Sequence, residues 1–115
     1  MSADTFDLAP SPWAWPVPLS SLRRVGQSVL TDRDGKGRPH FGLDLFAPLS
    51  SPILAAQSGR VVRIVDGRRS TEEGKRRAGL WVDIACDGLL CRYLHLGDVT
   101  IKANQQIRRG ALVAF

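Results

Sequence analysis

The sequence lacks any long apolar run, and this absence excludes a membrane-spanning helix. No apolar stretch approaches the ~20 residues that a helix needs to cross a bilayer. The N-terminus has neither the basic start nor the apolar core of a signal peptide. No window shows sustained helical periodicity, and neither internal repeats nor low-complexity segments occur. The chain as written therefore indicates a soluble, non-helical protein whose export, if it occurs, uses another route.

Histidine and cysteine are scarce, which limits the candidate sites. The only histidines in the sequence are His40 and His95. The two cysteines, Cys86 and Cys91, flank an Asp-Gly turn. They can pair as a disulfide across a hairpin or remain as two buried thiols, and both alternatives stay open. The cysteines therefore do not settle the redox compartment.

The charge is unbalanced toward the basic side. Lys and Arg number 16 against 11 acidic residues, which gives a net charge of +5 and a pI near 10.0. This balance favours polyanionic surroundings such as nucleic acid, anionic lipid or acidic cell-wall polymers, without choosing among them. A solvated basic surface is the commoner explanation. At 115 residues, the chain is long enough for one domain with a single modest core.

Short β-forming runs separated by turn residues predict an all-β fold, with antiparallel sheets forming a small sandwich or open barrel. Residues 1–11 are expected to be a loose tail, and residues 12–18 an extended segment laid against the body, because aromatics alternate with prolines there. Residues 66–79 are expected to form a long charged loop. The expected strands cover residues 25–30, 38–45, 53–56, 60–65, 80–85, 89–96, 99–101, 106–107 and 111–115.

Two of these strands place a histidine opposite an apolar face. In residues 38–45, His40 and Asp44 share one face with Gly42, while apolar side chains take the other. In residues 92–96, strict alternation puts Tyr93 and His95 on one face and two leucines on the other. Both histidines are therefore candidates for a polar groove.

Histidine nitrogen and carboxylate oxygen are zinc ligands, and a catalytic zinc site uses three protein ligands plus water. On a straight strand, residues four apart are separated by ~13 Å. The backbone between His40 and Asp44 must therefore bend to bring both to one ion, and Gly42 permits a bulge at the midpoint. Taken alone, the pair is more commonly explained as a surface histidine and a loop-capping aspartate than as a metal site. His95 alone is equally compatible with a structural, hydrogen-bonded histidine.

Residues 40–45, His-Phe-Gly-Leu-Asp-Leu, resemble the His-x-Gly-x-Asp signature of the lysostaphin-type zinc endopeptidases, which cut peptide cross-links in bacterial peptidoglycan. The similarity continues in register. It includes a Gly-x-Val strand at 59–62, a hairpin ending in Tyr-x-His-Leu at 93–96, and an Ile-x-x-Gly segment from 107 onward. The resemblance implies a peptidase domain over residues 12–115 with the all-β fold of that family.

By this resemblance, His40 and Asp44 would be zinc ligands, and His95 would be a catalytic histidine that orients or stabilises the attacked group. The implied substrate is a peptidoglycan peptide, and nucleic acid is disfavoured as a partner. The implied location is extracytoplasmic, in the periplasm or cell wall, although a cytoplasmic location stays open because no signal peptide is visible. The charged loop 66–79 would border the substrate groove, where it can grip acidic wall polymers or remain simply solvated.

The sequence departs from the family near its C-terminus. Members carry a His-x-His after the final strand, and one of these histidines is the third zinc ligand, whereas this sequence stops at Phe115. We therefore expect a domain that lacks this strand, or that receives it from a partner chain, and its activity as an enzyme stays open. One alternative is a non-catalytic cell-wall-binding or regulatory relative. A lesser one is a biotinyl or lipoyl carrier using Lys102, although that lysine lacks the usual flanking residues.

Overall fold

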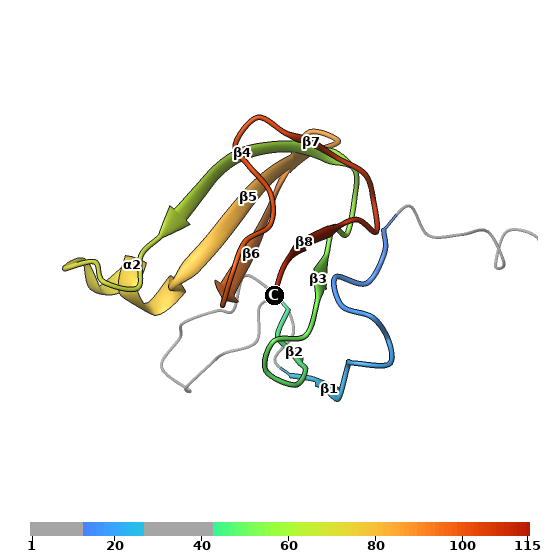
Figure 1. The fold of residues 1–115 in the computed structure, drawn as a ribbon, viewed down its shortest axis with the longest axis horizontal. Helices are drawn as coiled ribbons and strands as arrows, with labels where there is room; N and C mark the ends of the chain where they lie inside the picture. The colour runs from blue at the N-terminus through green and yellow to red at the C-terminus, as the bar shows by residue number, and fades with distance from the viewer. Residues whose placement is uncertain (1–12, 27–42) are drawn as a thin grey trace, which may run out of the picture.

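The computed structural model describes residues 13–26 and 43–115, and this part of the chain is built almost wholly from strands (Figure 1). The predicted all-β class with antiparallel sheets is confirmed. The strands of the described residues are β1 (Arg24–Val25), β2 (Leu45–Phe46), β3 (Ile53–Leu54), β4 (Gly59–Asp66), β5 (Leu80–Cys86), β6 (Leu89–Leu96), β7 (Gln106–Ile107) and β8 (Leu112–Ala114). The same ranges also contain a short helix, α2 (Glu73–Ala78).

The largest unit is a four-stranded antiparallel sheet in the order β6-β5-β4-β7, here called the long sheet. Two smaller antiparallel pairs, β1-β2 and β3-β8, complete the fold. Figure 1 shows β3 and β8 lying side by side next to the long sheet, with β1 and β2 below them. The chain end meets the turn after β6, where the Gly97 N–H donates to the Phe115 carbonyl at 2.7 Å.

The core lies between the long sheet and the β3-β8 pair. Alternate residues of β5, including Val82 and Ile84, are completely buried there, together with Val61 of β4 and Val113 of β8. Branched side chains of this kind suit a pleated surface that is buried on one face. Burying each such side chain contributes about 1.5–3 kcal/mol, so this layer is the main source of stability.

Gly59 allows the close approach of β4 to β5. A Cβ at this position would collide with the Ala85 carbonyl oxygen and would lie 2.9 Å from the Ile84 side chain. The Gly-x-Val pattern of the sequence therefore has a packing cause. Only a residue without a side chain lets the start of β4 pair with both β5 and β7.

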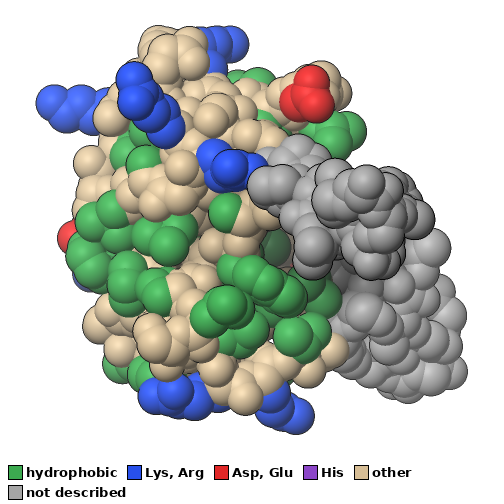
Figure 2. All heavy atoms as spheres, turned by 90° about the vertical axis from the view of Figure 1, so that its right-hand side faces the viewer, with side chains coloured by type: hydrophobic (Ala, Val, Ile, Leu, Met, Phe, Trp, Pro, Cys, Tyr) green, Lys and Arg blue, Asp and Glu red, His purple; other side chains and the backbone are tan. Residues whose placement is uncertain are grey.

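The N-terminal extended segment is confirmed from residue 13 onward. The Ala14 N–H donates to Ala56, and the Leu54 N–H donates to the Pro16 carbonyl, at 2.8 and 2.7 Å. Val17 is buried at the end of this segment. Figure 2 shows one side of the molecule, where hydrophobic side chains gather across the middle and Lys and Arg side chains lie above and below them.

Three sequence expectations need correction. The loop at 66–79 is not entirely loop, because it contains α2; Glu73 pairs with Arg77 at 2.6 Å, and basic residues fill the last turn. A helix of this length is too short to produce readable periodicity. Residues 99–101 form no strand and make only a single bridge, from Val99 to Ala114. The strand expected at 25–30 ends at Val25 as far as the structure describes it, since 27–30 lie outside the described residues.

The two cysteines pair as a disulfide, which decides between the alternatives that the sequence left open. The bond closes the β5–β6 hairpin at its tip. In the described ranges, no helix is long and apolar enough to cross a membrane.

Candidate active-site cleft

A cleft of about 1010 Å³ lies between the 43–51 segment and the end of β6. Asp44 and His95, which are far apart in the sequence, both line it. Its walls are largely apolar, and the side chains that form them include Leu43, Leu45, Phe46, Leu49, Ile53, Leu94 and Phe115. A largely apolar cleft with a few polar groups is the usual form of a ligand site in a small domain.

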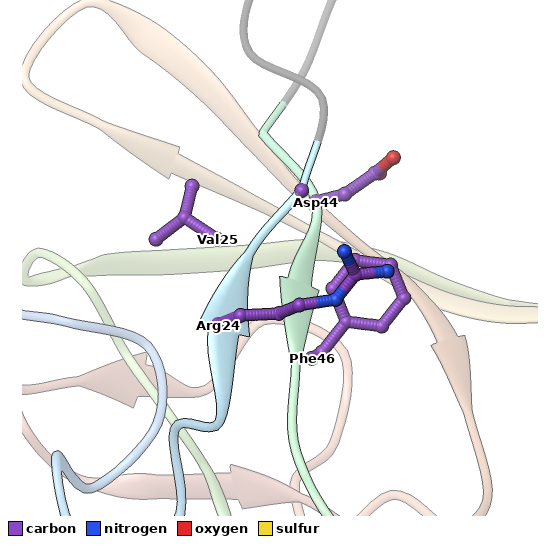
Figure 3. Close-up of a pocket in the computed structure, with 5 residues that line it drawn as sticks. Arg24, Val25, Asp44 and Phe46 are labelled. Atoms are coloured by element: carbon purple, nitrogen blue, oxygen red, sulfur yellow. The ribbon is translucent and has the colours of Figure 1, made fainter.

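The Asp44 side of the cleft is held by the β1-β2 pair. The Gly26 N–H donates to the Asp44 carbonyl at 2.7 Å, which continues the ladder beyond the end of β1. Figure 3 shows Asp44 and Phe46 projecting to the same side of β2, as alternation requires, with the Arg24 guanidinium over the Phe46 ring at 4.2 Å. A Cβ at Gly26 would meet the edge of the Phe46 ring, so a larger residue there would require the ring to move.

His95 occupies a β-bulge near the end of β6. Leu80 pairs with Leu96 and Val82 pairs with Tyr93, so two residues of β6 lie opposite one residue of β5. His95 has a positive φ of 62°, a left-handed conformation that is uncommon for a residue other than glycine. Unusual backbone conformations of this kind cluster at functional sites.

The bulge corrects the expected alternation in this strand. Tyr93 and Leu96 both pack against the core, whereas Leu94 is 41% exposed and His95 is exposed. The prediction that Tyr93 and His95 share a face is therefore wrong. The physical reason is that one extra residue in β6 shifts every later side chain to the opposite face.

Tyr93 anchors the strand before the bulge. Its hydroxyl oxygen accepts a hydrogen bond from the Ala56 N–H at 3.0 Å. Burial raises the pKa of Tyr93, and this effect outweighs the opposing effect of the Ala56 hydrogen bond. Tyr93 is therefore a neutral structural contact between β6 and the segment after β3.

Arg68 braces the backbone after the bulge. Its guanidinium donates to the Gly97 carbonyl at 3.3 Å and makes two hydrogen bonds to Asp66, at 2.9 and 2.7 Å. The hydrogen bonds from Arg68 lower the pKa of Asp66 to about 2. The hydrogen bond to Asp66 in turn raises the pKa of Arg68. The sequence analysis did not predict these contacts of Arg68. The one feature that could have indicated them is the opposite charge of Asp66, two residues earlier.

The donor groups in the cleft fit zinc in kind, since a carboxylate oxygen and an imidazole nitrogen are both zinc ligands. Asp44 and His95 line the same cleft, whereas His40 lies outside the described residues. Within residues 13–26 and 43–115, no three or more His, Cys, Asp or Glu side chains are grouped closely enough to hold a metal. The assignment of His40 and Asp44 as ligands, and of His95 as a catalytic residue, stays a prediction.

Residues 38–115 match the family model of Peptidase family M23. The chain belongs to this family. Its structure is also similar to the crystal structure of a zinc-containing peptidase from Vibrio cholerae, with a TM-score of 0.70 and 25% sequence identity. The similarity covers 87% of this chain and 30% of that one, so this chain spans under a third of the length of the Vibrio protein. The lysostaphin-like resemblance is confirmed, and the M23 match argues against the carrier alternative.

Proposed function

We propose that this M23 domain is a zinc-dependent endopeptidase that hydrolyses peptide cross-links of bacterial peptidoglycan in an extracytoplasmic setting. One observation carries the proposal: Asp44 and His95 line one cleft in a chain whose residues 38–115 match a peptidase family. The match begins just before His40 and includes all three proposed site residues.

In this proposal His40 and Asp44 hold the zinc. When bound, zinc supplies Lewis-acid polarisation of the scissile carbonyl and lowers the pKa of a water molecule. A catalytic zinc site uses three protein ligands. We propose that the third comes from the family's His-x-His segment, supplied after Phe115 or by a partner chain.

His95 would act on the substrate rather than on the metal. The bulge turns it outward into the cleft, while Tyr93 and Leu96 anchor the strand on either side. An imidazole held in this way can donate a hydrogen bond to the oxygen that gains charge, or it can carry a proton. The Arg68 contact to Gly97 would limit movement of the turn that follows β6, next to His95.

The apolar walls would position a peptide and exclude water. Leu49 is 98% exposed, and Phe46 and Phe115 are 43% and 39% exposed, so these walls offer uncovered apolar surface to a substrate. Burying such surface on binding is favourable at about 25 cal/mol per Å². The same walls would serve a non-catalytic cell-wall-binding relative, which is the second candidate function.

Zinc content and cleavage test the proposal together. The protein is compared with a version that carries a family-like His-x-His strand after Phe115, each dialysed against dilute zinc and then given cross-linked peptidoglycan peptides. The extended protein should hold zinc tightly and cut, whereas residues 1–115 alone should bind zinc weakly because they supply two of the three proposed ligands. Tight, stoichiometric zinc in the original would show that a ligand has been overlooked.

Substitutions in the extended protein separate the roles. His40→Ala and Asp44→Ala should lose zinc and activity together, whereas His95→Ala should keep zinc and lose mainly turnover. Asp98→Ala is the matched control, because Asp98 is another carboxylate that lines the cleft and should leave zinc unchanged. Loss of zinc in His95→Ala would make His95 a ligand. Zinc binding without any cleavage would favour the binding relative.

A further inference from the structure

The outer face of the long sheet, which points away from β3 and β8, carries an unusual concentration of arginine. Cross-strand register places Arg63 of β4, Asp83 of β5 and Arg92 of β6 in one row across this face. Arg60 lies in the neighbouring row, opposite Ala85. We call the surface around Arg60, Arg63 and Arg92 the arginine face.

Asp83 holds two of these arginines in fixed positions. Its side chain is completely buried, and its oxygens accept hydrogen bonds from Arg63 Nε at 2.6 Å and from Arg92 Nε and Nη2 at 2.7 and 3.0 Å. The Arg92 guanidinium also lies 5.4 Å from the Trp81 ring. Both guanidinium groups are therefore oriented before any ligand arrives, which reduces the entropy lost on binding.

The clamped arginines keep donors for another partner. Arg63 and Arg92 remain 53% and 45% exposed. Within the described ranges, Arg63 Nη1 and Nη2 and Arg92 Nη1 have no hydrogen-bond partner. Asp83 is covered, so the positive groups, and not the carboxylate, meet the solvent. A phosphate group can accept two parallel N–H bonds from one guanidinium, one at each of two oxygens.

Arg60 extends this surface beyond a single anion. Its side chain donates to the Asn104 side chain at 3.0 Å, and its backbone pairs with both β5 and β7. The guanidinium groups of Arg63 and Arg92 converge on Asp83. Arg60 pairs instead with Ala85, two residues further along β5, so the row of Arg60 lies about 7 Å from theirs along the strands. Cations at such intervals suit a chain of repeated negative charges better than one small ion.

We propose that the arginine face binds a linear phosphodiester polymer of the cell-wall kind. Charge complementarity carries the proposal, and the choice of a wall polymer rests on the proposed peptidoglycan function. Single-stranded nucleic acid fits less well, because it needs exposed aromatic rings on which bases stack. The aromatic residue of this face, Trp81, is only 7% exposed and already has Arg92 against its ring.

Binding of fluorescently labelled poly(glycerol phosphate) to the full chain, followed by anisotropy over a series of salt concentrations, tests the proposal. Arg63→Gln combined with Arg92→Gln should weaken binding about tenfold and reduce the salt slope by about 2. The matched control is Arg76→Gln with Arg77→Gln, which removes the same charge from α2. This control should change the affinity less than twofold. Equal losses in the two double variants would overturn the proposal.

One further variant and two competing ligands complete the test. Arg60→Gln changes a side chain whose contact is Asn104 at the exposed end of the sheet, and it should fold normally and bind about threefold more weakly. Unchanged binding by this variant would count against the arginine face even if the double variant does not fold. Tighter binding of duplex DNA, or of phosphatidylglycerol vesicles, than of the polymer would overturn the choice of partner. No zinc or cleavage is involved, so failure here leaves the peptidase proposal untouched.

Discussion

The two sides of the cleft are built with very different support. His95 lies on β6, which pairs with β5 along its length, and β5 in turn pairs with β4. Asp44 lies beside the β1-β2 pair, where, within the described residues, Arg24 pairs with Phe46 and Val25 with Leu45. β5 is buried almost throughout, whereas most of the 43–51 segment is exposed.

Because of this difference, we expect the His95 side of the site to be preformed and the Asp44 side to be stabilised when a ligand binds. A short strand pair whose described residues are mostly exposed has lower local stability than a buried central strand, which opens only with the whole domain. The sheet therefore fixes His95 in advance. The β1-β2 wall would gain stability when zinc or substrate joins Asp44 to the rest of the site.

The largest expected effect comes from truncating the sheet core. Ile84→Ala should lower the free energy of unfolding by about 4 kcal/mol, because Ile84 is completely buried and its removal leaves a cavity. Leu49→Ala, in the opposite wall, should change stability by less than about 0.5 kcal/mol, because Leu49 is 98% exposed. Urea denaturation of both variants checks the contrast, and similar losses would contradict it.

The second largest loss of stability is expected when an added side chain crowds β4 against β5. Gly59→Ala should cost about 3 kcal/mol, because its Cβ would collide with the Ala85 backbone oxygen, which cannot move aside. Gly74→Ala in α2 is the matched control, since a Cβ there meets nothing within 4 Å. It should stabilise the protein by up to about 0.8 kcal/mol through helix propensity. Thermal melts of both variants measure this contrast. A Gly59→Ala variant as stable as the wild type would refute the packing argument.

Asp83→Asn should cost about 2 kcal/mol at neutral pH, because it removes a buried charge that is shared by two half-exposed arginines. Burial alone raises the pKa of Asp83, but the hydrogen bonds from Arg92 and Arg63 outweigh burial and leave the pKa lowered. The contribution of this carboxylate is therefore complete above its unfolded pKa of about 3.9 and is lost as the pH falls through the lower folded value.

Unfolding titrations from about pH 5 to about pH 2 check this prediction. The wild-type free energy of unfolding should fall more steeply with acid than that of Asp83→Asn, so the two curves should converge. Asp87→Asn in the exposed hairpin turn is the control, and it should follow the wild type. Parallel curves for wild type and Asp83→Asn would disprove the assigned role.

The smallest effect concerns zinc and the weaker wall. If zinc joins Asp44, free zinc at about ten times its Kd should add about 1.4 kcal/mol to stability. Hydrogen exchange should then slow at the amides of Gly26 and Phe46 while β5 amides, already protected by the sheet, change little. Asp44→Ala should abolish the difference. Equal slowing in both regions would contradict the idea of an unevenly supported cleft.

Much of the fold was predictable because it depends on local patterns. Mostly apolar runs on either side of an Asp-Gly turn predicted β5, β6 and the hairpin between them, and the structure confirms all three. The helix within 66–79 was missed because six residues hold too few turns for a periodic signal. The family was recognisable because its motifs recur in order along the chain, as the match over residues 38–115 confirms.

The sequence by itself determined the strand pattern, the family, and that His40 and His95 are the histidines that residues 1–115 can contribute to a site. Only the tertiary structure decided that His95 occupies a bulge, that it shares a cleft with Asp44, and that Arg63 and Arg92 meet on Asp83. The physical reason is that each of these features depends on the register between strands. A shift of one residue moves a side chain to the other face, and that choice is made by packing across the sheet rather than by neighbours along the chain.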